Sequence, residues 1–290
     1  RVLFLHRSLH RRADILPVML LLGLLYSYIF NWGFSNFLLG MGLVFWNLGL
    51  WFHLRDRLGL AVAAASIGAL VIFFCHGFAF AIYGVLLGGL EFGRWQDGRD
   101  RSLPVLARTA GLLAVQAVIP AILFLQMPTS AAQGRTGSTI DAIARHSSGG
   151  SLAERLDVEF WHRLATIFRV AESPYPVLDV VTFCIVVAVL GVGLWKGWFR
   201  LYRWSWPVLA LIALFCLLTP PSLFGVGYLS DRLPLVMALL LVALLVSASP
   251  LPAGGRMAIA ILGVVAVVRL AGIMIGWTDY ARHYDNFRQV

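Results

Sequence analysis

The chain has 290 residues, of which 60% are hydrophobic and 13% are charged, and its formal net charge is +9. Soluble domains are typically about 45–50% apolar and about 25% charged, so this composition excludes an ordinary soluble protein and indicates a polytopic membrane protein. The basic residues lie between apolar runs, which favours a role in membrane orientation over nucleic-acid binding.

The apolar runs predict an all-α polytopic membrane protein with about nine transmembrane helices. They cover residues 15–30, 37–54, 58–75, 77–92, 104–126, 176–195, 207–218, 235–248 and 257–276. The third and fourth runs meet at His76 and Gly77. Because one span needs about 20 residues, a single helix through both runs would be too long. A tight hairpin at His76 is therefore predicted.

A long polar segment divides the runs into two groups. The predicted organisation is a first membrane bundle of five spans at 1–126, an extracytoplasmic loop at 127–175, a second bundle of four spans at 176–277 and the start of an extracytoplasmic tail at 278–290. Apolar residues at helical spacing within the loop predict an amphipathic helix at 152–170. This helix either packs against the membrane domain or forms a lid over a substrate.

The basic residues predict which way the chain is oriented. Lys and Arg gather in the short segments at 1–14, 55–57, 93–103 and 196–203 and at Arg256. The short segments of the other side hold only Arg232, with Arg282 and Arg288 in the tail. Because cytoplasmic loops carry the excess of Lys and Arg, we expect the N-terminus to be cytoplasmic and the C-terminus to lie outside. Since the chain begins at Arg1 and not at Met, we also expect a piece of a longer protein.

The predicted outer face collects most of the polar side chains that suit a site. The loops and helix ends there supply Asn31, Asn36, His76, Tyr228, Asp231 and Arg232. Arg269, in the outer half of the last run, joins them because a charge within a span normally faces the bundle interior or a cavity, and Asp179 is its available ion-pair partner. Simpler roles remain open for each: helix caps, a turn histidine, a structural ion pair and an arginine anchored at the lipid headgroups.

The sequence contains no cofactor motif. The cysteines, Cys75, Cys184 and Cys216, lie in or at the end of apolar runs without metal-ligand spacing, and we interpret them as buried packing residues. No nucleotide-binding glycine loop, zinc motif or serine-nucleophile motif is found. A divalent metal would need acidic ligands from a part of the protein before Arg1.

An Asn-rich outer turn at 31–36, the hairpin at His76 and Arg232-Leu-Pro234 entering a late span resemble the membrane portion of the C-type glycosyltransferases. The resemblance implies a polytopic enzyme of a bacterial inner (plasma) membrane that uses a polyprenyl-phosphate-linked sugar at the extracytoplasmic face. Its partners would be membrane lipids, the lipid-linked sugar donor and other membrane proteins, with no nucleic acid. Arg232 matches a basic residue that contacts the lipid phosphate in the family. The catalytic acid of the family lies in the first outer loop, which is either absent here or precedes Arg1.

The chemistry of glycosyl transfer selects the candidate residues. It needs a base to deprotonate the acceptor and cations to hold the departing phosphate. The catalytic candidates are Asp231, Asp179 and His76, and the substrate-binding candidates are Arg232, Arg269, Asn31, Asn36 and Tyr228. Two other functions stay open: a lipid or solute transporter, and a non-catalytic membrane subunit of a larger complex. Proton or sodium coupling is disfavoured, because Gln116 is the main polar side chain deep in a span.

Overall fold

The computed structural model describes residues 1–98, 100–126, 161, 165–168, 170, 172–219 and 228–288. The predicted amphipathic helix at 152–170 lies for the most part outside these residues. The described elements are α1 (Val2–His10), α2 (Leu16–Leu24), α3 (Tyr28–Asn31), α4 (Ser35–His53), α5 (Leu58–Cys75), α6 (Gly77–Asp97), α7 (Leu103–Gln126), α11 (Pro176–Trp195), β1 (Phe199–Leu201), α12 (Ser205–Leu218), α13 (Leu229–Leu244), β2 (Leu245–Ser247) and α14 (Ala253–Arg288).

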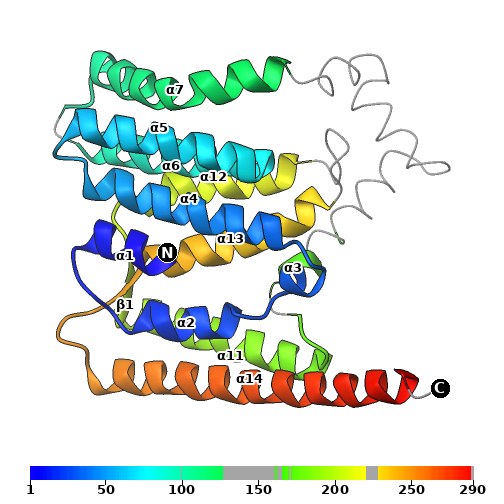
Figure 1. The fold of residues 1–290 in the computed structure, drawn as a ribbon. Helices are drawn as coiled ribbons and strands as arrows, with labels where there is room; N and C mark the ends of the chain where they lie inside the picture. The colour runs from blue at the N-terminus through cyan, green and yellow to red at the C-terminus, as the bar shows by residue number, and fades with distance from the viewer. Residues whose placement is uncertain are drawn as a thin grey trace, which may run out of the picture.

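The chain is a helical membrane protein whose long helices run side by side (Figure 1). Within the described residues, five helical segments are long and apolar enough to cross a membrane: α4, α5, α7, α11 and residues 253–282 of α14. The predicted count of nine is not confirmed. α12 is apolar but shorter, with 14 residues. α6 carries Glu91, Arg94 and Asp97 within its length, and α13 has only 16 residues.

The helices of both halves of the chain pack against each other. In the first half, α4 packs against α1, α5 and α6, and α7 packs against α5. From the second half, α12 packs against α6, α13 against α1 and α2, and α14 against α2 and α11. The buried core therefore mixes side chains from both predicted bundles, among them Phe45 and Trp51 of α4 and Val236 of α13.

The predicted hairpin at His76 is confirmed. α5 ends at Cys75, α6 begins at Gly77, and His76 between them is extended, with φ −166° and ψ 109°. One extended residue is enough to reverse the chain here, and α5 and α6 pack against each other.

Three predicted segments differ from the structure. The first run, 15–30, is not one helix: α2 ends at Leu24 and the short α3 follows. The eighth run, 235–248, is displaced: α13 begins earlier, at Leu229, and ends at Leu244, where β2 pairs antiparallel with β1. The carboxylate of Asp14 accepts the backbone N–H of Ser247 at 2.6 Å, which holds β2 in its extended form. The predicted tail is helical, because α14 continues to Arg288.

The bundle has two ends with different chemistry (Figure 1). We call the end that holds residues 54–57, 100–102 and 196–204 the basic end, because the Lys- and Arg-rich segments meet there (Figure 1). We call the opposite end, where α5 turns at His76 and α11 and α13 begin, the far end.

The free cysteines differ from the prediction in one respect: Cys75 and Cys216 are half-buried, but Cys184 is exposed on an apolar helix surface.

Candidate functional site

A cavity of about 280 Å³ lies between α2, α11, α13 and α14, and we call it the chain cavity. Its walls are almost entirely apolar. They are formed by Met19, Leu20, Gly23, Leu24, Ile167, Val170, Thr182, Phe183, Val186, Val187, Leu190, Pro234, Met237, Ala238, Leu241, Val242, Leu245, Leu262, Val265 and Ala266. On α13 these residues recur every three or four positions, so that a single face of the helix lines the cavity.

A buried ion pair lies about one helical turn beyond two of the residues that line the chain cavity. Arg269 follows the lining residue Ala266 by one helical turn, and Asp179 precedes Thr182 by one turn. Arg269 Nη2 lies 3.6 Å from Asp179 Oδ1, and the Arg269 side chain is 0% exposed. Asp179 Oδ2 also accepts the backbone N–H of Ser173 at 2.6 Å. The ion pair that the sequence suggested therefore forms through Oδ1 of Asp179, while Oδ2 is engaged by Ser173.

Arg269 also explains why α2 ends early. Its Nη1 donates to the carbonyl of Gly23 at 3.1 Å, and its Nη2 donates to the carbonyl of Tyr26 at 3.2 Å. The last carbonyls of a helix have no partner within the helix, and a cation at this end is also favoured by the helix dipole. Arg269 supplies both the donors and the charge, so the chain can leave the helix at Leu24 without burying bare carbonyls.

Arg232 forms a second cluster at the far end. Its Nη1 lies 3.1 Å from Nε2 of His76. Its guanidinium lies over the ring of Phe34, with Cζ 4.2 Å from the ring centroid, and 5.3 Å from that of Phe37. The side chain is nearly buried, since Arg232 is 4% exposed. Aromatic faces attract a guanidinium, and the effect grows when water is excluded.

The contact between Arg232 and His76 fixes the protonation of the imidazole. Arginine has only donors, so Nε2 of His76 must accept, and its proton must lie on Nδ1. Burial and the positive charge of Arg232 lower the pKa of His76, which lies in the turn outside the helices, and this favours the neutral ring. His76 therefore positions Arg232, and its accepting nitrogen is already engaged. This arrangement does not suit the predicted role of general base.

The other predicted residues are spread around these clusters. Asn31 accepts a hydrogen bond from the hydroxyl of Tyr26 at 3.0 Å, and the side chain of Asn36 is exposed. The Tyr228 ring lies 5.4 Å from that of Trp32 and 6.2 Å from that of Phe34. Asp231 is buried in the first turn of α13, next to Arg232.

The two arginines lie at similar depth but on different faces. Arg232 precedes the lining residue Pro234 by two positions, so the backbones of Arg232 and Arg269 both lie within about one helical turn, roughly 5.4 Å, of the far end of the cavity. Two positions along a helix correspond to about 200° of rotation. Arg232 therefore points to the side of α13 opposite the chain cavity, towards His76, Phe34 and Phe37.

The sequence did not indicate the chain cavity or a second polar cluster at the basic end. In that cluster, Glu91 accepts the indole N–H of Trp51 at 2.7 Å and lies 3.1 Å from Arg55 and 3.6 Å from Arg94. The sequence signal that could have indicated this cluster is Glu91, a carboxylate within an apolar run, followed one helical turn later by Arg94.

The part of the chain that the structure describes shows no group of three or more His, Cys, Asp or Glu side chains arranged to hold a metal ion. In comparisons with known proteins, no family model, curated protein or solved structure matches this chain. The function is therefore argued from the geometry of the site.

Proposed function

We propose that this protein binds a lipid-phosphate-linked sugar as the membrane portion of an enzyme similar to the C-type glycosyltransferases. In this proposal the hydrocarbon chain lies in the chain cavity and the phosphate lies at the far end, which faces the outside of a bacterial inner (plasma) membrane. The observation that carries the proposal is an apolar cavity along α13, whose first turn carries Arg232 on the opposite face of the same helix.

The volume and lining of the chain cavity support a hydrocarbon guest. Its volume of about 280 Å³ and its apolar walls suit an apolar guest. Water gains little there, because a buried water needs two to four polar partners and even an apolar cavity of about 150 Å³ stays dry and takes up apolar molecules. Within a membrane the nearest apolar guest is a lipid chain. Its gain on entering is the dispersion contact with the walls.

The polar residues of the far end divide into two roles under this proposal. Arg269 is committed to Asp179 and to two carbonyls, so it holds the chain between α2 and α3 in place. Arg232 is held by a neutral His76 and two aromatic rings, and we assign to it the contact with the phosphate. Asp231, the neighbour of Arg232, is the candidate base that would deprotonate the acceptor.

Filling the chain cavity tests the proposal. Ala238→Phe places a ring in the cavity, and we expect it to weaken binding of a radiolabelled polyprenyl phosphate to the purified protein at least tenfold, about 1.4 kcal/mol. The matched control is Ala188→Phe on the exposed face of α11, which should bind like the unmodified protein. Monodisperse elution and unchanged thermal unfolding establish that both variants are folded. Equal binding by both would contradict the placement of the chain.

Replacing Arg232 tests the phosphate contact. A guanidinium offers two parallel N–H donors to phosphate oxygens, whereas an ammonium acts as a point charge. Arg232→Lys should weaken polyprenyl-phosphate binding and Arg232→Ala should weaken it more, by about 1.5–3 kcal/mol or roughly ten- to hundredfold. Arg282→Ala, an exposed arginine of α14, is the control. If the unmodified protein and the three variants bound polyprenyl phosphate equally, Arg232 would have only a structural role.

The same lipid separates the alternative functions. Incubation with a radiolabelled polyprenyl-phosphate sugar should release polyprenyl phosphate if the protein transfers the sugar. Intact lipid that crosses the bilayer of a vesicle would instead indicate a transporter. Binding without release or crossing would indicate a non-catalytic subunit.

A further inference from the structure

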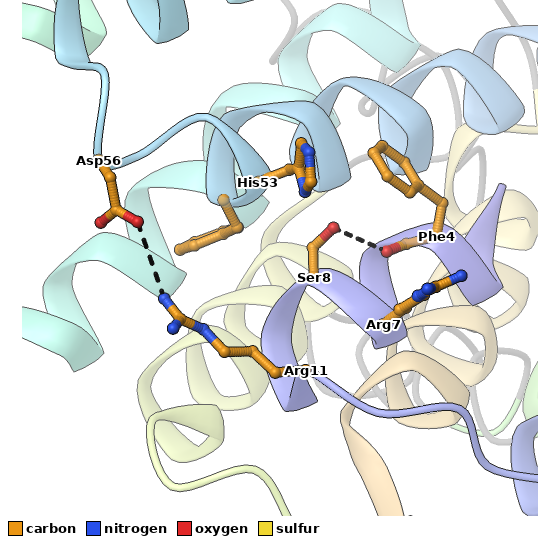
Figure 2. A pocket seen from close by; sticks show the side chains of 7 residues that line it. Phe4, Arg7, Ser8, Arg11, His53 and Asp56 are labelled. Atoms are coloured by element: carbon orange, nitrogen blue, oxygen red, sulfur yellow. Dashed lines mark hydrogen bonds and ion pairs between the residues drawn. The ribbon is translucent and has the colours of Figure 1, made fainter.

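A groove at the basic end lies between α1 and the end of α4, and we call it the basic groove (Figure 2). Its volume is about 520 Å³. Figure 2 shows Arg7, Ser8 and Arg11 on the α1 wall, with His53 and Asp56 on the opposite wall. The groove continues into a neighbouring hollow of about 340 Å³, since Ser8, Arg11 and Asp56 line both.

The charges of the basic groove are not balanced by the protein. Arg7 lies in the last turn of α1, and Arg11 follows the helix as its C-cap residue, so that their guanidiniums extend towards opposite ends of the groove (Figure 2). Asp56 is the acidic residue of the groove, and its contact with Arg11 is 4.0 Å long, with side chains that are 84% and 89% exposed. An ion pair this open is weak and screened by salt. No ion pair to Arg7 is found within the described residues. An anion bound in the groove would supply the negative charge that the two guanidiniums lack.

The walls of the basic groove change from apolar to charged along its length. Phe4 lies deeper along α1, packed against Gly49 and 6.0 Å from the His53 ring, whereas Arg11 lies just past the end of α1 beside Asp56. From Phe4 to His10, the last residue of α1, the helix rises by roughly 9 Å. An amphipathic molecule with its anionic group at the membrane surface matches this order, and free phosphate would leave the deeper aromatic part unfilled.

We propose that the basic groove binds the phosphate headgroup of an anionic phospholipid from the leaflet at the basic end, with Arg7 and Arg11 holding the phosphate oxygens. Basic pockets between membrane helices are suited to such headgroups, and each Arg near the surface adds to the attraction. The site lies at the opposite end of the bundle from Arg232 and the far end of the chain cavity. It is independent of the proposed function.

The test compares lipid binding by the purified protein in mixed micelles that contain phosphatidylglycerol or phosphatidylcholine. We expect tighter binding of phosphatidylglycerol, and we expect the double variant Arg7→Gln/Arg11→Gln to weaken it about thirtyfold. The matched control is Arg57→Gln/Arg101→Gln, which removes two exposed charges from the same end but not from the groove. It should stay within about twofold of the unmodified protein.

Two further arms separate the lipid from free phosphate. Inorganic phosphate should not displace phosphatidylglycerol at millimolar concentration, and Phe52→Ala in the apolar wall should weaken lipid binding. Displacement by inorganic phosphate would show that the groove binds a free anion and not a lipid. If the control double variant lost as much phosphatidylglycerol binding, the groove would not be the binding site, because the attraction would then come from the whole basic end.

Discussion

Arg269→Met is expected to lower the free energy of unfolding by about 3–5 kcal/mol, because it leaves a buried carboxylate without its cation. Asp179 is 7% exposed, and the carbonyls of Gly23 and Tyr26 would also lose their donors. Unfolding in detergent micelles, followed by circular dichroism as SDS is added, measures the change. Arg282→Ala, which breaks an exposed pair on the same helix, should change stability by no more than about 0.5 kcal/mol.

A double variant separates the ion pair from the carbonyl contacts of Arg269. Arg269→Met/Asp179→Leu removes both charges, and buried pairs replaced by apolar side chains are often neutral or stabilising. We therefore expect the double variant to regain most of the lost stability. If it stays as unstable as Arg269→Met, the contribution of Arg269 lies in holding the break between α2 and α3. An Arg269→Met protein as stable as Arg282→Ala would contradict both roles.

Glu91→Leu is expected to destabilise the basic end by about 3–4 kcal/mol, because Glu91 joins three partners. The Trp51 side chain is 0% exposed and would lose the acceptor of its indole N–H. Arg55, whose side chain is 17% exposed, would lose its carboxylate at 3.1 Å. Glu91→Gln keeps an acceptor for Trp51 but no charge, so a loss of about 1–2 kcal/mol is expected.

Thermal unfolding of Glu91→Leu and Glu91→Gln, read by tryptophan fluorescence and circular dichroism, distinguishes these effects. Asp100→Asn is the control, because Asp100 is an exposed acid of the same end whose contact with the backbone N–H of Ser102 an amide oxygen preserves. Equal stability of Glu91→Leu and Asp100→Asn would show that the cluster around Glu91 contributes nothing to the fold.

The chain cavity and the break after α2 illustrate why part of the site could not be predicted from the sequence. The two residues that meet at the far end of the cavity, Arg269 and Asp179, were identified because a charge within an apolar span needs a partner. Their additional contacts, to Gly23, Tyr26 and Ser173, depend on how α2, α11 and α14 approach one another. The apolar run at 15–30 carries no signal for its break, since the donors that satisfy those carbonyls come from α14.

Local composition alone determined the class of the protein and much of its organisation. A high apolar content placed the chain in a membrane, the junction at His76 separated α5 from α6, and the basic segments that meet at one end were already grouped by charge. Only the tertiary structure decided which helix faces line a cavity and which partner each buried charge receives. The reason is that a span is apolar all round, so its lipid-facing, neighbour-facing and cavity-facing residues are alike in sequence and are distinguished only when the helices pack.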